Sequence, residues 1–227
     1  MRRLALFDLD HTLLPLDSDY EWALALVRLG AVDGERYQAE NARFYAQYQA
    51  GTLDMAEFLR FSLAPLAKYP RATLDAWHQG YMRDVIRPQI HAAARALVAD
   101  HQRAGDLCLL VTATNRFVTA PIAREFGLPE DALIATDIEE TAAGEFTGRP
   151  RSTPAFREGK ITGTEAWLAA RGLGWDSFAS STFYSDSIND VPLLERVTAP
   201  VATNPDDRLR ALALERGWRV LDLFPRP

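Results

Sequence analysis

The stretch Leu4-Ala5-Leu6-Phe7-Asp8-Leu9-Asp10-His11-Thr12 decides the fold of this 227-residue chain. It opens with a short apolar run that stops at a turn, a pattern typical of a buried β-strand. Two carboxylates and a hydroxyl therefore follow at the carboxyl end of a strand, where open α/β sheets bind their ligands. Alternation along a strand puts Asp8 and Asp10 on the same side, where they can hold one hard cation or act as nucleophile and acid.

Size and composition limit the class of protein. A chain of 227 residues favours one catalytic core with an insertion. The net charge is −6 and no run of like charge occurs, which disfavours nucleic acid and an anionic membrane surface as partners. Cys108 is the only cysteine, which excludes a multi-cysteine metal site, and its apolar neighbours indicate core packing. No apolar stretch is long enough for a signal peptide or a membrane span, so we expect a soluble, cytoplasmic protein.

Residues 16–87 differ in character from the rest of the chain. They are rich in aromatic residues at helical spacing and show no strand-like alternation. Glycine and proline breaks divide them into four expected helices, at about 18–30, 34–50, 54–68 and 71–86. The sequence thus predicts a small helical module inserted after the first strand.

Strands and helices alternate after this insertion. A helix is expected from Pro88 to about Ala104, and then a strand over 107–111 that leads into Thr112-Ala113-Thr114. Further strands are expected at 132–136, 182–184, 199–202 and 219–221, with a β-hairpin at 138–147. This alternation predicts an α/β core with a parallel sheet, formed by residues 1–15 and 88–227, beside the all-helical segment 16–87.

Four groups of polar residues stand at the ends of these strands or at the start of a helix. They are Asp8 with Asp10 and Thr12, then Thr112, then Lys160 in Glu158-Gly159-Lys160, and finally Asp186 with Asn189 and Asp190. If they converge, each close pair of carboxylates repels by roughly 4 kcal/mol at about 4 Å, so a cation must lie among them. Oxygen ligands favour Mg²⁺ over zinc, and a hydroxyl, a lysine and turn amides beside it would trap a phosphoryl group.

Together these residues resemble the four motifs of the haloacid dehalogenase superfamily, in the same order from residue 8 to residue 190. The helical insertion is similar to the cap of the phosphoserine-phosphatase-like branch. The resemblance implies a Rossmann-like core with an inserted helical cap, and a Mg²⁺-dependent phosphomonoesterase acting on a small phosphorylated metabolite. A dehalogenase is disfavoured, because Asp10 and the metal carboxylates serve phosphate chemistry.

The resemblance also implies roles for the residues. Asp8 would attack phosphorus to give an aspartyl-phosphate, and Asp10 would protonate the leaving oxygen and then activate water. Asp8, the backbone carbonyl of Asp10 and Asp186 would bind Mg²⁺, with Asp190 behind them or reaching the metal through water. The phosphoryl group would be held by Asp8, Leu9, Asp10, Thr112, Ala113, Lys160 and Asn189, and Lys160 would count among the catalytic residues.

Asp17, Asp19 and Tyr20 follow the first motif directly and are the candidate specificity residues. Asp17 stands where phosphoserine phosphatases carry a glutamate, and Thr112-Ala113-Thr114 stands where Ser-Gly-Gly is usual, so phosphoserine itself is disfavoured. The acidic pair suits an amine or imidazolium, as in histidinol phosphate, although a helix N-cap also explains either aspartate.

Other interpretations stay open. The chain could be a phosphoserine phosphatase, a phosphotransferase or a non-catalytic phosphometabolite-binding protein. Single aspartates after strands often cap helices, and a lysine at a helix start is often solvated. Thr12 is expected to shape the loop and His11 to point away from substrate. Surface or packing positions are expected for His78, His91, His101, Arg43 and Arg60.

Overall fold

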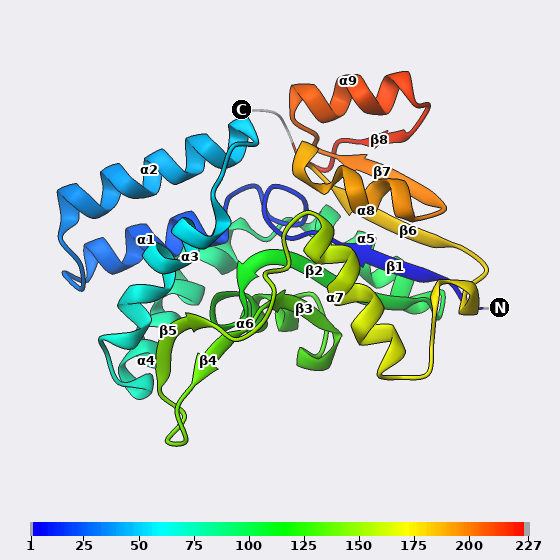
Figure 1. Cartoon of the computed structure of the whole chain (residues 1–227). Coiled ribbons are helices and arrows are strands. Elements are labelled where there is room, and N and C mark those ends of the chain that lie inside the picture. Colours follow the sequence, from blue (N-terminus) through cyan, green and yellow to red (C-terminus); the bar gives the residue numbers. More distant parts are fainter. Residues whose placement is uncertain (1, 225–227) are drawn as a thin grey trace.

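The computed structural model describes residues 2–224, and a six-stranded parallel sheet lies at its centre (Figure 1). The strand order is β3-β2-β1-β6-β7-β8. The strands are β1 (Leu4–Phe7), β2 (Leu107–Asn115), β3 (Leu133–Thr136), β6 (Ser181–Ser185), β7 (Ala199–Thr203) and β8 (Arg219–Leu221). Every pairing is parallel, which confirms the predicted α/β class. β1 is thus an interior strand between β2 and β6.

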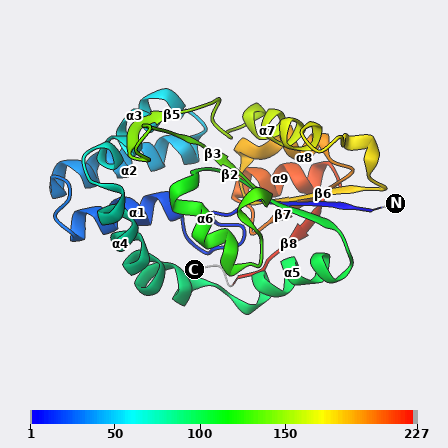
Figure 2. The same ribbon diagram turned by 90° about the horizontal axis from the view of Figure 1, so that it is seen from below.

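Alternate side chains of β1 enter two different hydrophobic cores. Ala5 and Phe7 pack with residues of α5 (Ala92–Arg103) and α6 (Arg116–Glu125). Leu4 and Leu6 pack with residues of α7 (Glu158–Ala169), α8 (Val191–Arg196) and α9 (Asp207–Glu215). Figure 2 shows α5 on one side of the sheet and α7 with α8 on the other. Burial on both faces explains the continuous apolar run of this strand.

The only regular elements in residues 18–86 are helices, and they lie to one side of the sheet (Figure 1). The elements are α1 (Ser18–Arg28), α2 (Gly34–Ala50), α3 (Met55–Leu63), η1 (Ala64–Ala67), α4 (Arg71–Tyr81) and η2 (Met82–Ile86). We call these elements the helical cap. The four expected helices are confirmed, the third and fourth each ending in a change of helix type. The division of the chain at 15/16 and 87/88 remains a prediction that this all-helical stretch supports.

The connection from the cap to the core corrects one prediction. No α-helix opens at Pro88: Arg87–Gln89 form a 3₁₀ turn, η3, and Ile90 is extended. The α-helix starts only at Ala92, after His91 in extended conformation. Pro88 suits the first turn of either helix type, so it could not show that the backbone would leave the helical region two residues later.

The predicted hairpin is confirmed and packs against the cap. β4 (Ile138–Glu140) and β5 (Phe146–Pro150) pair antiparallel in a small sheet of their own. At Gly148, where φ is +75°, a Cβ would lie 3.0 Å from the Ala67 Cβ and 3.2 Å from the Leu63 carbonyl oxygen. The hairpin backbone therefore packs directly against the end of α3 and against η1 of the cap.

The remaining short helices are 3₁₀ turns that connect the larger elements: η4 (Glu130–Ala132), η5 (Trp175–Ser177) and η6 (Ile188–Asp190). None of the helices between residues 2 and 224 has the length and apolar character needed to cross a lipid bilayer. The prediction that Cys108 packs in the core is confirmed, since it is buried on β2.

Candidate active site

The strand register brings the predicted motifs to one edge of the sheet. Phe7, the last residue of β1, pairs with Leu110 of β2 and Tyr184 of β6, and the Asp8 backbone N–H donates to the Tyr184 carbonyl at 2.9 Å. Thr112 and Asp186 each lie two residues beyond those partners. These side chains therefore meet where the strand order reverses around β1, the usual ligand site of an open α/β sheet.

Lys160, in the first turn of α7, joins two of the carboxylates. Its ammonium nitrogen lies 2.7 Å from Asp8 Oδ1 and 2.6 Å from Asp190 Oδ2, and its side chain is 2% exposed. Ser185 Oγ donates to the same Asp190 oxygen at 2.7 Å. Burial lowers the pKa of Lys160, but Asp190 and Asp8 outweigh it and raise the pKa above its usual value. The lysine is therefore a buried cation and not a solvated one.

The Thr12 hydroxyl connects the other two carboxylates. Its Oγ1 lies 3.3 Å from Asp8 Oδ2 and 3.1 Å from Asp186 Oδ1, and accepts from the Asp186 backbone N–H at 3.0 Å. Burial raises the pKa of Asp8 to about 7, against the influence of Lys160. Burial and the neighbouring Asp8 raise the pKa of Asp186 well above its usual value. A cation beside these oxygens would relieve the repulsion.

Asp10 is turned toward the cap. Its Oδ1 accepts from the Ser18 backbone N–H at 2.8 Å, and its Oδ2 accepts from Thr114 Oγ1 at 2.8 Å. Burial, with the nearby Asp17, raises the pKa of Asp10 to about 6. Thr114 was not among the predicted site residues. It reaches Asp10 because β2 continues to Asn115 and does not end at Val111, and the Thr114 backbone N–H donates to Thr112 Oγ1 at 3.2 Å.

A small cavity of about 60 Å³ lies between these strand ends and the cap. Core residues that line it are Asp8, Asp10, Thr112, Ala113 and Thr114, and lining residues before or in the cap are Asp17, Asp19, Tyr20, Asn41, Phe44, Tyr45, Tyr48, Leu53, Met55 and Phe58. We call it the active-site pocket. Within the described part of the chain its lining holds four carboxylates and no lysine, arginine or histidine.

The specificity candidates Asp17 and Asp19 have structural partners as well as a place in this pocket. Asp17 Oδ1 accepts from the Tyr20 backbone N–H at 2.9 Å and caps α1, as the alternative explanation predicted. Asp19 Oδ1 accepts from Asn115 Nδ2 at 3.1 Å. Burial and the nearby Asp17 raise the pKa of Asp19 to about 8. The ionised form of these carboxyl groups is thus disfavoured unless a cation lies beside them.

Three further residues of the motif segments contact the protein itself and do not line the pocket: Leu9, Asn189 and His11. Leu9 is fully buried, and its carbonyl accepts from the backbone N–H groups of Thr12, Leu13 and Leu14. Asn189 is buried beside Asp190, and its amide nitrogen donates to the Tyr48 carbonyl of the cap at 3.0 Å. His11 adopts a positive φ of 56° and its Nε2 lies 3.1 Å from the Tyr45 hydroxyl, so its ring faces the cap.

The other histidines and cap arginines have packing or surface positions, as expected. His78 is buried against the Val118 carbonyl, His101 bonds Asp106 and Tyr184, and His91 is exposed. Arg43 pairs with Glu40 and Glu57, and Arg60 is exposed.

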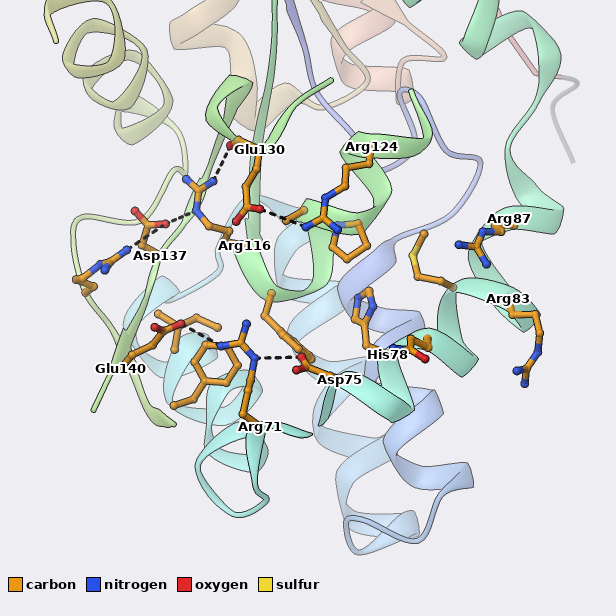
Figure 3. A pocket seen from close by; sticks show the side chains of 18 residues that line it. Arg71, Asp75, His78, Arg83, Arg87, Arg116, Arg124, Glu130, Asp137 and Glu140 are labelled. Carbon is orange, nitrogen blue, oxygen red and sulfur yellow. Dashed lines mark hydrogen bonds and ion pairs between the residues drawn. The ribbon is translucent and has the colours of Figure 1, made fainter. Parts of the chain in front are cut away.

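A second pocket, of about 730 Å³, lies between α4, α6 and the β4–β5 hairpin (Figure 3). Its arginines are paired with carboxylates: Arg71 with Asp75 and Glu140, Arg83 with Asp84, Arg87 with Glu125, Arg116 and Arg151 with Asp137, and Arg124 with Glu130. None of the strand-end residues lines it. This pocket is larger, but Asp8, Asp10 and Thr112 of the predicted motifs line the small one.

Fold and site together define a protein with a parallel α/β core, an inserted helical cap and a cluster of carboxylates at the strand ends. Residues 5–195 match the haloacid dehalogenase-like hydrolase family, so the chain belongs to this family. It is 45% identical to a histidinol-phosphatase of Neisseria meningitidis, covering 98% of this chain and 99% of that protein. It is 33% identical to a phosphoserine phosphatase of Mycobacterium tuberculosis, covering 96% of this chain and 70% of that one. The predicted class of enzyme, a phosphatase, is confirmed.

Solved structures agree on the fold. A protein of unknown function from Bordetella pertussis shares 54% identity with a TM-score of 0.93, covering 99% of this chain and all of that one. A substrate-bound phosphoserine phosphatase has a TM-score of 0.68 at 16% identity, covering 97% and 93% of the two chains. At 16% identity, the similarity to this phosphoserine phosphatase concerns the fold alone.

Proposed function

We propose that this phosphatase is a Mg²⁺-dependent phosphomonoesterase that hydrolyses a small phosphorylated metabolite through an aspartyl-phosphate on Asp8. The observation that supports this most directly is the buried Lys160 ammonium, 2.7 Å from Asp8 Oδ1, beside a pocket lined by Asp8, Asp10 and Thr112. A fixed cation next to a buried carboxylate suits an incoming phosphoryl dianion that must meet an anionic nucleophile.

The proposed reaction has two steps. In the first, an Asp8 oxygen forms a bond to phosphorus while the bond from phosphorus to the alcohol oxygen breaks, and Asp10 gives that oxygen its proton. In the second, Asp10 takes a proton from water, the water oxygen bonds to phosphorus, and phosphate leaves Asp8. Asp10 suits this role because Ser18 and Thr114 hold its two oxygens at the cap side of the pocket.

Phosphoryl oxygens would be held by Lys160, Thr112 and the backbone N–H groups of Leu9, Asp10 and Ala113. Such donors stabilise charge that develops in the transition state. Asn189 would contribute only if its amide gave up the hydrogen bond to the Tyr48 carbonyl and donated to the phosphate instead.

The donor set fits Mg²⁺. Within residues 2–224 no three His, Cys, Asp or Glu side chains form a complete metal site, but Mg²⁺ is usually bound by only one or two carboxylates and keeps several waters. Asp8 and Asp186, both next to the Thr12 hydroxyl, would supply those carboxylates, together with the Asp10 backbone carbonyl. Asp190 would stay behind them, because Lys160 and Ser185 occupy its Oδ2. When bound, the metal would neutralise charge on the phosphoryl group and its nucleophile.

The carboxylates of the pocket support a cationic leaving group, because a cation beside them would favour their ionised form and offset the burial that raises the pKa values of Asp17 and Asp19. Asp17 and Asp19 line the pocket together with the rings of Tyr20 and Tyr45, and no basic side chain lines it among the described residues. A substrate carboxylate, as in phosphoserine, would find no positive side chain in this lining. An amine or imidazolium would find a carboxylate partner. We therefore propose an amino-alcohol phosphate such as histidinol phosphate, in agreement with the name of the Neisseria relative.

A panel of phosphate esters tests this proposal. Released phosphate is measured with histidinol phosphate, phosphoserine and p-nitrophenyl phosphate, for the native enzyme, for the enzyme with EDTA and for Asp8→Asn. We expect turnover of histidinol phosphate well above that of phosphoserine, and loss of all turnover with EDTA or Asp8→Asn. Full activity of the EDTA-treated enzyme or of Asp8→Asn would refute the proposed mechanism. Preference for phosphoserine over histidinol phosphate would refute the proposed substrate. Added alcohols would reveal phosphotransfer as a new ester.

A further inference from the structure

The C-terminal end of α2 is held by side chains of the core. The last carbonyls of an α-helix have no partner within the helix, so they need other donors. Asn189 Nδ2 donates to the Tyr48 carbonyl at 3.0 Å, and Arg157 Nη2 donates to the Gly51 carbonyl at 2.5 Å. Arg157 Nη2 also lies 3.2 Å from Asn189 Oδ1. These two core residues thus form one connected unit with the end of the helix.

Arg208, near the start of α9, completes this arrangement. Its guanidinium donates to the Ala50 carbonyl at 3.2 Å and also to the Gln49 carbonyl. Figure 1 shows the end of α2 turned toward α9. Four consecutive carbonyls therefore receive hydrogen bonds from three core side chains, two of them cationic, at the negative end of the helix dipole.

The backbone on both sides is shaped for this contact. Gly51 ends α2 with a φ of +74°, and a Cβ there would lie 3.6–3.7 Å from Arg208, Arg157 and Asn189. Arg157 itself has a φ of 51°, although it is not glycine. Such a conformation is costly and persists where the surroundings demand it. The loop before α7 is thus bent so that Arg157 reaches the cap.

The opposite side of the cap is attached differently. There Trp22, His78 and Tyr81 of the cap pack in an aromatic cluster with Phe117 of α6. In α2, by contrast, only Asn41 and Phe44 are buried. The end of this helix contacts the core through the hydrogen bonds of Asn189, Arg157 and Arg208 and through one tilted ring contact, between Tyr48 and Phe156. Water can replace polar contacts at small net cost, whereas separating apolar surfaces is unfavourable throughout. The α2 side is therefore the side that can open.

We infer that Arg157, Asn189 and Arg208 form a clasp that closes α2 over the active-site pocket, and that the cap opens at this end to exchange ligands. α2 carries Tyr45 and Tyr48, which form part of the pocket wall. Asn189 is next to Asp190, the partner of Lys160, so the clasp ties that wall to the catalytic loop. The three residues act as positioning residues. The identity of the ligand that enters the pocket rests on the proposed function. The inference that these three residues hold the cap closed does not depend on it.

The test uses Arg157→Ala/Arg208→Ala, which leaves Asn189 intact. Arg216→Ala is the matched control, because Arg216 follows α9 and pairs with Glu195 of the core. The first measurement is amide hydrogen exchange by mass spectrometry without substrate. We expect exchange about tenfold faster in residues 41–52 and in the facing loop 186–190, and unchanged exchange in α4. Unchanged exchange in 41–52, or a similar increase in α4, would overturn the inference.

The second measurement compares two phosphate donors. For histidinol phosphate, whose leaving group needs the α2 wall, we expect KM to rise about tenfold in the double variant while kcat stays within about twofold. For acetyl phosphate, too small to reach that wall, kcat/KM should change less than about twofold. Equal losses on both donors would indicate general damage and refute the clasp. If the native enzyme turns over neither donor, the proposed function fails, while the exchange measurement still decides the clasp.

Discussion

The Lys160 ammonium lies 2.7 Å from Asp8 Oδ1, and both side chains are almost completely buried. This ion pair spans 152 positions of sequence and joins the end of the central strand to the start of α7. With Asp190 it makes a buried group of one cation between two carboxylates. Under the proposed function, this group serves both the stability of the fold and the binding of phosphate.

Replacing this cation should destabilise the protein as well as inactivate it. In Lys160→Met two buried carboxylates lose their partner, and breaking a buried pair in this way costs about 3–5 kcal/mol. Urea unfolding at pH 7 measures the loss. Adding Asp190→Asn to the variant removes one of the uncompensated charges, so part of the stability should return while activity stays absent. If the double variant were less stable than Lys160→Met, the repulsion argument would be wrong.

The hydroxyl of Thr12 should matter for Mg²⁺. Thr12→Val keeps the shape of the side chain but removes the group that lies 3.3 Å from Asp8 and 3.1 Å from Asp186. Losing a partner that orients metal ligands typically costs about 10–100-fold in metal affinity or activity. A titration of activity against Mg²⁺ should show a shifted half-saturation and recovery at high metal. Thr119→Val, at a buried threonine of α6, is the control and should behave as the native enzyme.

The charge of Asp17 should select the substrate. Asp17→Asn removes the carboxylate from the pocket, but asparagine also caps helices, so α1 should remain stable. An interaction with a charged group is worth about 1.5–3 kcal/mol, so kcat/KM for histidinol phosphate should fall about 10–100-fold. For phenyl phosphate, which has no cation, it should fall less than about twofold. An equal loss for both esters would show that Asp17 acts only on structure.

His78 should make the fold less stable below neutral pH. Burial lowers its pKa from 6.5 to about 4, against the hydrogen bond to the Val118 carbonyl. Between these values the unfolded chain binds the proton and the native state does not, so stability falls as the pH falls from about 6.5 to 4. This histidine alone should cost about 2 kcal/mol between pH 7 and pH 5.

Urea unfolding at both pH values measures this effect. His78→Gln cannot titrate in this range, so it should lose that part of the pH dependence. The exposed His91→Gln should keep it. The same pH dependence in native protein and His78→Gln would assign the effect to other groups.

Much of this site can be predicted from the sequence because it is built from local patterns. Alternation and apolar runs locate β1, β2 and β6, and the parallel sheet follows from the order of elements. Asp8 and Asp186 then must meet, since each directly follows an interior strand, and Thr112 lies near the carboxyl end of the neighbouring strand β2. Lys160 is predictable as a helix-start residue, but its two ion pairs are not, because they depend on how α7 is placed against the sheet.

What the sequence determined by itself is the class of fold and the chemical groups at its edge, because strand burial and residue order are properties of short segments. The tertiary structure alone decided that Thr114 holds Asp10, that His11 faces Tyr45, and that Arg157 bends back to the end of α2. These contacts join segments far apart in the chain, and each depends on the packing of the cap against the core. The hydrophobic periodicity of a short segment does not predict that packing.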